Sequence, residues 1–281
     1  MKHYITDKTI YITEYNSLSE FFTDITSRPN NKFFADRHSS ERYEPENKAN
    51  KWYNTKDFKE ATELLTHGWD AAAGKLATKV KLTNATSTAV RSSKPSYGVV
   101  GSQASVPRYL QGIPTNMVSR QMTYAKQKVV TITKGIAYNC GWSPESILRE
   151  CTKALQIIQS MENGGQRVRL NVVWCITSDD SLHHAVCKVC VKQPDERMNL
   201  SKMAFALAHP SMLRRMFFKW LETDNFTEHD MGWCYGYPAE QSIKDKVMGE
   251  NEYYIPEEIK DMDALIATLT GSGKKPGPAT K

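Results

Sequence analysis

The sequence feature that most constrains the fold is a change of apolar spacing within residues 128–192. Val130 and Ile132 occupy alternate positions, as in a strand that buries one face. An apolar stripe at helical spacing follows, with Ser143 placed as its N-cap and a Gly-Gly pair at its end. Residues 168–176 then alternate again. A strand, a helix of about 20 residues and a second strand predict a βαβ unit, with parallel strands and a right-handed crossover.

The residues after this unit predict the rest of the core. Residues 185–191 carry apolar side chains at every second position, and the short turn before them favours a strand antiparallel to the preceding one. Asn199 or Ser201 starts a helix that the pair His209-Pro210 interrupts, and Pro256 starts a last amphipathic helix. We therefore predict an α/β (or α+β) fold: a βαβ unit plus an antiparallel strand in a mixed sheet, with covering helices and a helical N-terminal extension.

Composition divides the chain into four predicted segments. The first holds a strand-like run, a helix capped by Ser17, a polar segment, and a second helix that ends at Gly68. The segments are residues 1–70 as an N-terminal extension with the polar segment at 36–51, residues 71–127 as a basic linker with a Gly/Pro loop, residues 128–270 as the α/β core, and residues 271–281 as a disordered tail.

Residues 71–144 form a window without Asp or Glu, although the chain has 31 acidic residues among 281. Ten Lys and Arg residues give this window a charge of +10, and the rest of the chain carries −4, which together give the net charge of +6. Cations without neighbouring acids project a positive field, and polyanions are the commonest partners of such a field. Four tyrosines and a tryptophan lie among the cations, and unpaired bases stack on such rings. A flexible Ser/Thr-rich connection with a solubilising charge is the alternative.

The window and a later helix supply the predicted nucleic-acid-binding residues. Three glycines and two prolines within residues 97–114 require special backbone angles, which predicts an ordered loop with one helical turn. Two later arginines are placed on the polar face of a helix, where they could contact phosphates or form a solvated cationic surface. The predicted contact residues are Lys75, Lys79, Lys81, Arg91, Lys94, Arg108, Tyr109, Arg120, Lys126, Lys128, Arg214 and Arg215.

Residues 179–190 contain the side chains that could bind a metal or act in catalysis. His183 with Cys187-x-x-Cys190 suggests zinc, but on a strand these two thiols face opposite sides, which favours buried structural cysteines. Asp179 and Asp180 with His183 could hold an ion or act in acid–base chemistry, although hairpin turns favour Asp for conformational reasons alone. No nucleophile elbow, metalloprotease motif or dinucleotide fingerprint occurs. We therefore predict no metal, no cofactor and no catalytic residues, and a non-enzymatic protein rather than an enzyme.

The cysteines and the apolar runs indicate the compartment. Most of the six cysteines lie inside apolar strand-like or helix-like runs, which suits reduced thiols in a cytoplasm. The apolar runs are only a few residues long, far short of the roughly 20 needed to span a bilayer, so no membrane partner is predicted. The first seven residues have neither an apolar core nor a cleavage site, so we expect no secretory signal.

Motifs spread over most of the chain resemble a family of uncharacterised bacteriophage proteins. They are Ser17-Leu18, Lys56–Ala61 leading to Gly68-Trp69, Gly101 through Val106-Pro107, Tyr109-Leu110, Gly112, Pro114 and Met117, then Ser143-Pro144-Glu145, and His209-Pro210 with Arg214-Arg215. This resemblance implies a phage origin and no defined chemistry. The order of strands and helices also resembles the opening of a von Willebrand A-type fold. That fold carries an Asp-x-Ser-x-Ser metal motif after its first strand, whereas this chain has Asn139–Ser143 without the Asp.

Two functions from different classes follow from these patterns. The first is a phage-encoded, non-enzymatic nucleic-acid-binding protein that assists viral replication or transcription in the host cytoplasm, with single strands among its candidate substrates. The alternative is a protein-binding accessory protein, either a virion component or an inhibitor of a host or defence protein. Its contact would be the loop Gly101–Pro114, and a viral or host polymerase or replication protein would be a candidate partner. A hydrolase or nuclease that uses Asp179, Asp180 and His183 is a third hypothesis.

Overall fold

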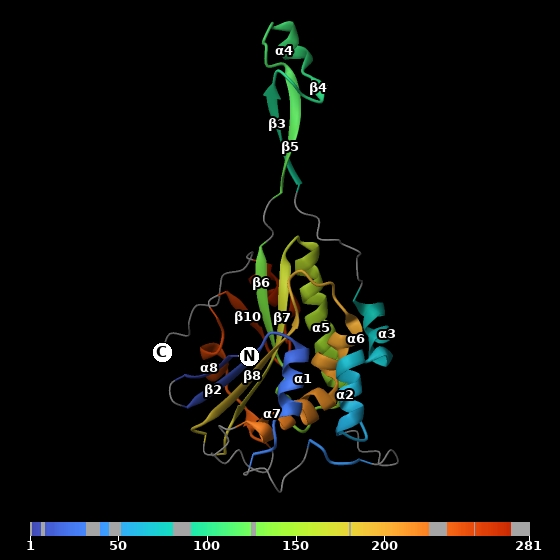
Figure 1. Cartoon of the computed structure of the whole chain (residues 1–281), viewed down its shortest axis with the longest axis vertical. Helices are drawn as coiled ribbons and strands as arrows, with labels where there is room; N and C mark the ends of the chain where they lie inside the picture. Colours follow the sequence, from blue (N-terminus) through green and yellow to red (C-terminus); the bar gives the residue numbers. More distant parts are fainter. Residues whose placement is uncertain are drawn as a thin grey trace.

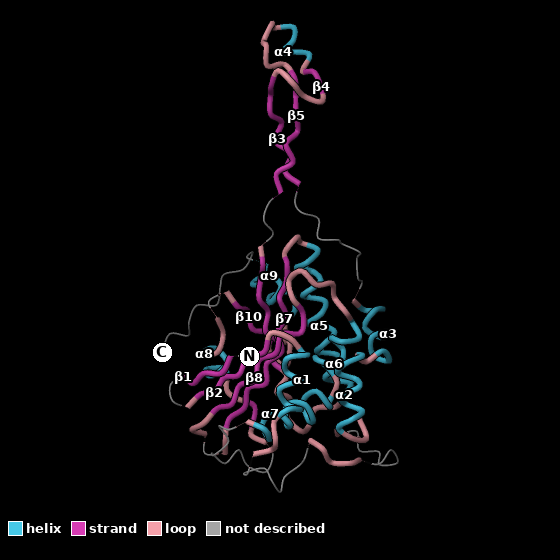
Figure 2. Tube along the Cα trace, in the orientation of Figure 1, coloured by secondary structure: helices cyan, strands magenta, loops and turns pink. Residues whose placement is uncertain are grey.

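A mixed sheet with most of its helices on one face forms the body of the molecule, and a second, smaller sheet projects from it (Figures 1 and 2). This computed structural model describes residues 2–6, 9–31, 40–44, 52–80, 91–124, 128–179, 181–224, 235–249 and 251–270. For residues 2–6, 91–94, 120–124 and 270 it describes the backbone only. The predicted tail and most of the predicted polar segment lie outside these ranges.

The main sheet has seven strands in the described part of the chain, in the order β1-β2-β8-β7-β6-β10, with β9 beside β7. The strands are β1 (Lys2–Thr6), β2 (Ile10–Tyr15), β6 (Val129–Gly135), β7 (Arg167–Thr177), β8 (His184–Lys192), β9 (Tyr237–Pro238) and β10 (Glu252–Ile255). Strands β6 and β7 are parallel, and β7 and β8 are antiparallel, as predicted. Strand β2 is parallel to β8, and β10 is parallel to β6. The mixed sheet with its helices confirms the predicted fold class.

Helix α5 (Pro144–Asn163) completes the predicted βαβ unit. The backbone N–H of Ser146 donates to the Ser143 hydroxyl at 3.2 Å, which satisfies one of the unpaired donors at the helix start. At the other end, the N–H of Gly164 donates to the carbonyl of Ser160. The apolar stripe of the helix, including Leu155, is buried in the main core against β6 and β7. The caps and the stripe therefore determine both the bounds of this helix and the face that it buries.

The other helices of the body gather on the same face of the sheet, except α8 (Figure 1). They are α1 (Leu18–Ser27), α2 (Phe58–His67), α3 (Asp70–Lys79), α6 (Leu200–Ala208), the π-helix η2 (Met212–Phe217), α7 (Phe218–Thr223), α8 (Gln241–Lys246) and α9 (Met262–Thr270). The predicted cap Ser17 accepts the backbone N–H of Glu20. Of the two candidate caps of α6, Asn199 and Ser201, it is Asn199 that accepts a backbone N–H, from Lys202. On the opposite face, α8 and its flanks cover a smaller core that includes Ile12 of β2.

The N-terminal residues belong to the main sheet, so the prediction of an extension outside a core of residues 128–270 is wrong. Tyr11 of β2 lies opposite Ala185 of β8, and Phe21 of α1 is fully buried in the main core. Without β2, the outer edge of β8 would present unpaired backbone groups. A parallel pairing between segments so distant in the sequence leaves no local pattern, because only the strand itself is visible in the amino-acid order.

The last predicted helix begins later than expected, at Met262 instead of Pro256. The ammonium group of Lys134 donates to the carbonyls of Pro256 and Glu257 at 2.6 and 3.1 Å. The N–H of Ile259 donates to a buried carboxylate of α5 at 2.8 Å. The backbone groups of Pro256, Glu257 and Ile259 therefore form tertiary hydrogen bonds. The helix starts only after these residues, at Met262.

Candidate nucleic-acid interface

Residues 91–124 form a projecting element, here called the β-arm, which stands apart from the main sheet (Figure 1). Its sheet has the order β3-β5-β4, with β3 (Arg91–Gly98), β4 (Gln103–Ala104) and β5 (Met117–Tyr124), and α4 (Val106–Leu110) follows β4. Together with α3, the β-arm replaces the linker that we predicted for residues 71–127. Strands β3 and β5 pair through their backbones, and their sequences contain too few apolar residues to show a strand-like alternation.

The Gly/Pro loop at the end of the β-arm is ordered by backbone contacts. A Cβ atom at Gly101 would lie 2.6 Å from the carbonyl oxygen of Val118, so only glycine allows the chain to cross β5 this closely. The N–H groups of Ser102 and Ser105 donate to the carbonyls of Val118 and Asn116 at 2.9 and 2.7 Å. Helix α4 supplies the helical turn that we predicted for this loop.

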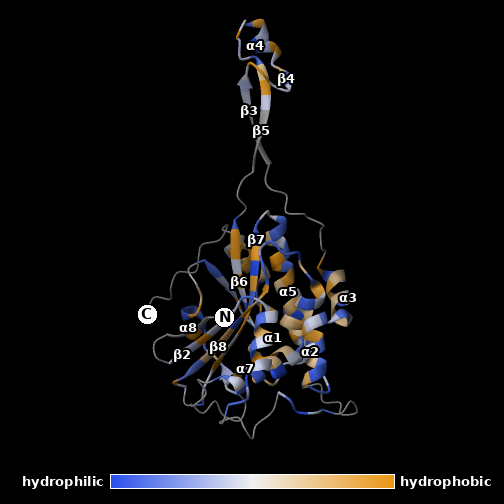
Figure 3. Cartoon of the chain, in the orientation of Figure 1, coloured by the Kyte–Doolittle hydropathy of each residue, from blue (hydrophilic) through white to orange (hydrophobic). Residues whose placement is uncertain are grey.

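The end of the β-arm exposes an unusual amount of apolar surface. Among the described residues, ten large hydrophobic side chains are exposed, and six of them lie on the β-arm. We call this set the apolar tip: Tyr97, Val99, Val100, Val106, Tyr109 and Leu110. Val100 is 84% exposed and Leu110 is 78% exposed. Hydrophobic colour accordingly appears at the end of the arm in Figure 3, and clustered exposed apolar groups are typical of binding surfaces.

Arg108 holds a positive charge at this tip. Its guanidinium carbon lies 3.8 Å from the centroid of the Tyr97 ring, within the range of a cation–π interaction. Its Nη1 donates to the carbonyl of Thr115 at 3.1 Å, which links α4 to the start of β5. Tyr109, the predicted stacking residue beside it, is 68% exposed. The structure thus brings one predicted cation and one predicted aromatic residue together with the apolar tip.

The other predicted cations of the window are distributed around the arm. Lys75 and Lys79 are exposed on α3, the last described helix before the arm, and Lys128 is exposed immediately before β6. Lys81 and Lys126 lie outside the described residues, and Arg91, Lys94 and Arg120 are described by their strand backbone only.

Lys134, the last cation of the window, does not contribute to a surface charge. Its side chain is fully buried, and its ammonium group donates to the carbonyls of Gly135, Pro256 and Glu257. Burial lowers the pKa of this ammonium group to about 8. The charge of +10 counted from the sequence therefore overstates the field that the folded protein projects.

Arg215 was predicted to lie on an exposed polar face, and this prediction is wrong. Its side chain is fully buried, and it donates to the carbonyls of Ser40, Arg42 and Thr55 at 2.8–2.9 Å. Its Nε also donates to the Thr55 hydroxyl, and its guanidinium lies over the ring of Tyr53. The residues before α2 therefore cover the face of η2 that would otherwise be solvated.

Arg214 is buried in the same way, so it is not a surface phosphate contact either. Its Nη1 donates to the carbonyl of Trp52 at 2.6 Å, and its guanidinium carbon lies 3.7 Å from the centroid of the Trp52 ring. Burial lowers the pKa of this guanidinium to about 10. Both arginines hold the segment before α2 against η2 by hydrogen bonds. The sequence around the arginines gives no sign that a distant segment will bury them.

Two residues of the hydrolase or nuclease hypothesis, Asp179 and His183, lie in the turn between β7 and β8. Asp179 is exposed there, whereas Asp180 lies outside the described residues. The N–H of His183 donates to the Ser178 hydroxyl at 3.1 Å, and Ser181 has a φ of 59°. These features are those of a turn that selects small polar residues for its conformation.

The cysteines of β8 are buried and free, in agreement with their interpretation as structural thiols. Cys187 lies in the main core. Cys190 lies opposite Asn171 in the strand register between β7 and β8, and its side chain is on the other face of the sheet. Burial raises the pKa of both thiols. Within the described ranges, no group of three or more His, Cys, Asp or Glu residues is placed to hold a metal ion.

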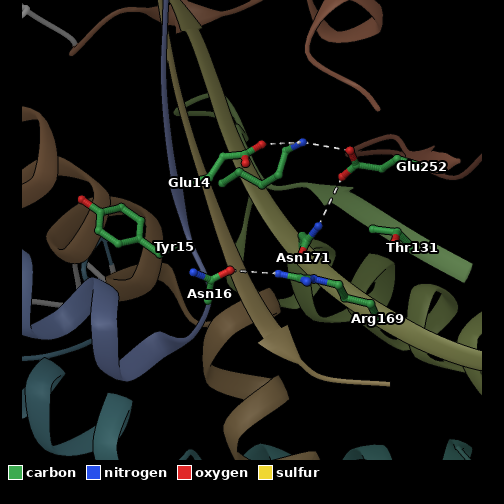
Figure 4. Close-up of a pocket in the computed structure, with 8 residues that line it drawn as sticks. Glu14, Tyr15, Asn16, Thr131, Arg169, Asn171 and Glu252 are labelled. Atoms are coloured by element: carbon green, nitrogen blue, oxygen red, sulfur yellow. Dashed lines mark hydrogen bonds and ion pairs between the residues drawn. The ribbon is translucent and has the colours of Figure 1, made fainter. Parts of the chain in front are cut away.

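A polar pocket on the face opposite the main core was not predicted (Figure 4). It has a volume of about 230 Å³, and its centre is Lys188, whose ammonium group lies 2.9 Å from Glu252 and 3.4 Å from Glu14. Asn171 donates to Glu252 at 3.2 Å, and Arg169 lies beside it on β7. Burial raises the pKa of Glu252, but Lys188 and a hydrogen bond from a threonine hydroxyl outweigh this effect, and the pKa lies below its ordinary value.

The charges of this pocket balance, so it has no surplus charge to attract a polyanion. Two carboxylates, Glu14 and Glu252, face the cations Lys188 and Arg169. The signal that could have revealed the pocket is the polar pair Arg169 and Asn171 at alternate positions of β7. The contribution of Glu252 could not be predicted, because β10 enters the sheet from far along the chain.

The fold and its projecting arm define the protein as a mixed α/β protein with a β-arm that carries an apolar, cationic tip. Among the described residues, no helix is both long and apolar enough to cross a bilayer. The family described as Domain of unknown function (DUF7192) matches residues 2–269, and the chain belongs to this family. No curated protein and no solved structure gives a significant match.

Proposed function

We propose that this protein binds nucleic acid through the β-arm and acts without catalysis. The observation that carries this proposal is that an acid-free, strongly cationic window supplies an arm that projects from the body and exposes aromatic and aliphatic side chains at its end. Cations at the surface of such an arm would bind phosphates, and its rings and aliphatic groups would contact bases. The β-arm thus carries groups that can bind the phosphates and groups that can contact the bases.

The charge of the arm itself supports the proposal. Residues 91–124 contain four cations, namely Arg91, Lys94, Arg108 and Arg120, and no acidic residue. Exposed lysines also lie where the chain leaves the body and where it returns, on α3 and immediately before β6. No carboxylate on the arm would therefore repel a phosphate backbone that lies along it.

The biological setting is part of the proposal. The resemblance to bacteriophage proteins supports a role in viral replication or transcription, with a location in the host cytoplasm. A viral or host polymerase or replication protein would then be the natural partner at the same nucleic acid. The phage origin depends on the resemblance, whereas the role at a nucleic acid depends on the binding that the experiment below tests.

The first prediction is that salt weakens binding through the cations of the arm. In a filter-binding titration at two salt concentrations, replacing the four arm cations with Gln should lower the affinity by about 10²-fold. The slope of log K against log salt concentration should become shallower by up to about 3.6, because each of the four phosphate contacts on a duplex contributes about 0.9 to this slope. The variant carries Arg91→Gln, Lys94→Gln, Arg108→Gln and Arg120→Gln.

A matched control removes the same charge from the body. Lys56, Lys59, Lys202 and Lys260 are exposed and lie outside the acid-free window. Their replacement with Gln lowers the net charge by the same amount, and we expect a much smaller loss of affinity. Equal losses in both variants, or no binding by the unmodified protein at low salt, would contradict the proposal.

A second candidate function is binding to another protein, and the aliphatic side chains of the apolar tip favour it. Val99, Val100 and Leu110 are each more than two-thirds exposed, as is common at the centre of a protein interface before the partner binds. An acidic partner would match the charge of the arm. A pull-down from host lysate after nuclease treatment separates the two functions: partners that survive nuclease favour protein binding, and partners lost with the nucleic acid favour the first proposal.

A further inference from the structure

We infer that the apolar tip of the β-arm inserts between neighbouring base pairs of duplex nucleic acid and bends the duplex. This inference rests on the proposed function, and it adds the form of the substrate and the action of the arm on it. It starts from the four aliphatic side chains of the tip, which are Val99, Val100, Val106 and Leu110. Their exposed fractions lie between 63% and 84%.

These side chains need an apolar partner that phosphates and sugars cannot supply. The faces of the bases are the extensive apolar surface of a nucleic acid, and in a duplex they are covered by stacking. A side chain reaches them only where two neighbouring base pairs separate. Proteins that insert aliphatic side chains in this way bend the duplex, because the step opens on one side.

The position of the aliphatic side chains is suited to a wedge. Val99 and Val100 directly follow β3, and Leu110 is the last residue of α4. Figure 1 shows α4 at the far end of the arm. The turn is held against β5 by the close approach of Gly101 to Val118, so the wedge is supported by backbone contacts. A supported wedge resists being pushed back when a base step opens.

The charge around the tip favours a nucleic acid over an apolar protein groove as the occupant. The window that contains the arm has no acidic residue, and Arg108 is held beside the tip by the Tyr97 ring and the Thr115 carbonyl. A positive charge fixed next to a wedge can bind the phosphate that flanks the opened step. The charge and the apolar tip then act on one ligand.

The tip is better suited to a duplex than to single strands. Single-strand binding uses aromatic rings on which successive bases stack. Here one face of Tyr97 is covered by the Arg108 guanidinium, and aliphatic side chains form most of the exposed apolar surface. Aliphatic side chains are among the groups that proteins insert between the base steps of a duplex.

The experiment measures bending separately from binding. A duplex of about 30 base pairs, long enough for a bent site, carries a donor and an acceptor dye at its two ends. Binding of the full chain should raise energy transfer between the dyes, as expected for a bend of roughly 20–90°. A titration at low salt with the same duplex gives the affinity, and a single strand of the same sequence is titrated in parallel.

The test variant is Val100→Ser with Leu110→Ser, and the matched control is Val129→Ser with Leu182→Ser. All four side chains are exposed, and the control pair lies on the body. We expect the tip variant to bind with less than about a tenfold loss of affinity and an unchanged salt dependence, but without the rise in energy transfer. The control should bend the duplex as the unmodified protein does, and equal thermal unfolding of both variants would show that they fold.

The outcomes separate the inference from the function on which it rests. Duplex binding without bending by the unmodified protein, or bending that the tip variant retains, overturns the wedge and leaves nucleic-acid binding intact. Preference for the single strand without duplex bending also overturns it and assigns the tip to unpaired bases. No binding to either oligonucleotide at low salt overturns the proposed function together with the wedge, and binding of the tip to a protein becomes the remaining explanation.

Discussion

Replacing Arg215 with Met is expected to lower the free energy of unfolding by about 3–5 kcal/mol. The buried guanidinium donates to the carbonyls of Ser40, Arg42 and Thr55, and Met has no donor for them. Each buried carbonyl left without a partner costs about 1–3 kcal/mol, and partial relaxation of the segment before α2 reduces the sum. Denaturant unfolding monitored by circular dichroism measures the loss.

The matched control for this prediction is Arg149→Met. The Arg149 side chain is 65% exposed on α5, so its loss should cost less than about 1 kcal/mol. The experiment also decides between the structural role of Arg215 and the phosphate contact predicted from the sequence. A stable Arg215→Met protein with weakened binding to nucleic acid would support the phosphate contact and contradict the buried network.

Leu155→Ala is expected to lower the free energy of unfolding by about 2–5 kcal/mol. Leu155 lies in the middle of the buried stripe of α5 and has no exposed surface. The truncation removes buried methyl groups and leaves a cavity between α5 and the sheet, and both effects destabilise the folded state. The loss can be measured from thermal or denaturant unfolding.

The same substitution at an exposed leucine provides the control. Leu182 is 63% exposed in the turn before β8, and Leu182→Ala should change the free energy of unfolding by less than about 0.5 kcal/mol. A cost below ~1 kcal/mol at Leu155 would mean that the stripe of α5 does not pack against the sheet. The βαβ arrangement of the core would then have to be revised.

The part of the fold that could be predicted is the part specified by local signals. Ser143, the apolar stripe and the Gly-Gly pair defined α5, and the alternation around Leu170 defined its partner strand. Parallel pairing then followed from the length of the connection. The position of β2 beside β8 could not be predicted in this way, since it depends on which distant strand completes a sheet edge.

In the candidate site too, the features that depend on neighbouring residues could be predicted, and those that depend on distant segments could not. The absence of acids around Arg108 and Tyr109 is a property of the sequence alone, and it coincides with the region that forms the β-arm. The burial of Arg214 and Arg215 depends on a segment more than a hundred residues earlier in the chain, which covers them. A charged residue in the sequence therefore indicates a charged surface only if no distant segment of the chain buries that residue.

The β-arm lies between α3 and β6 in the sequence, so that the body of the protein precedes and follows it. Among the residues whose side chains the structure describes, none from the β-arm belongs to the main core or to the smaller core of the opposite face. Substitutions, insertions or deletions at the end of the arm therefore leave the packing of the body unchanged. The body is constrained by its need to stay folded, whereas the end of the arm is constrained only by what it binds, so the two parts of one gene can evolve at different rates.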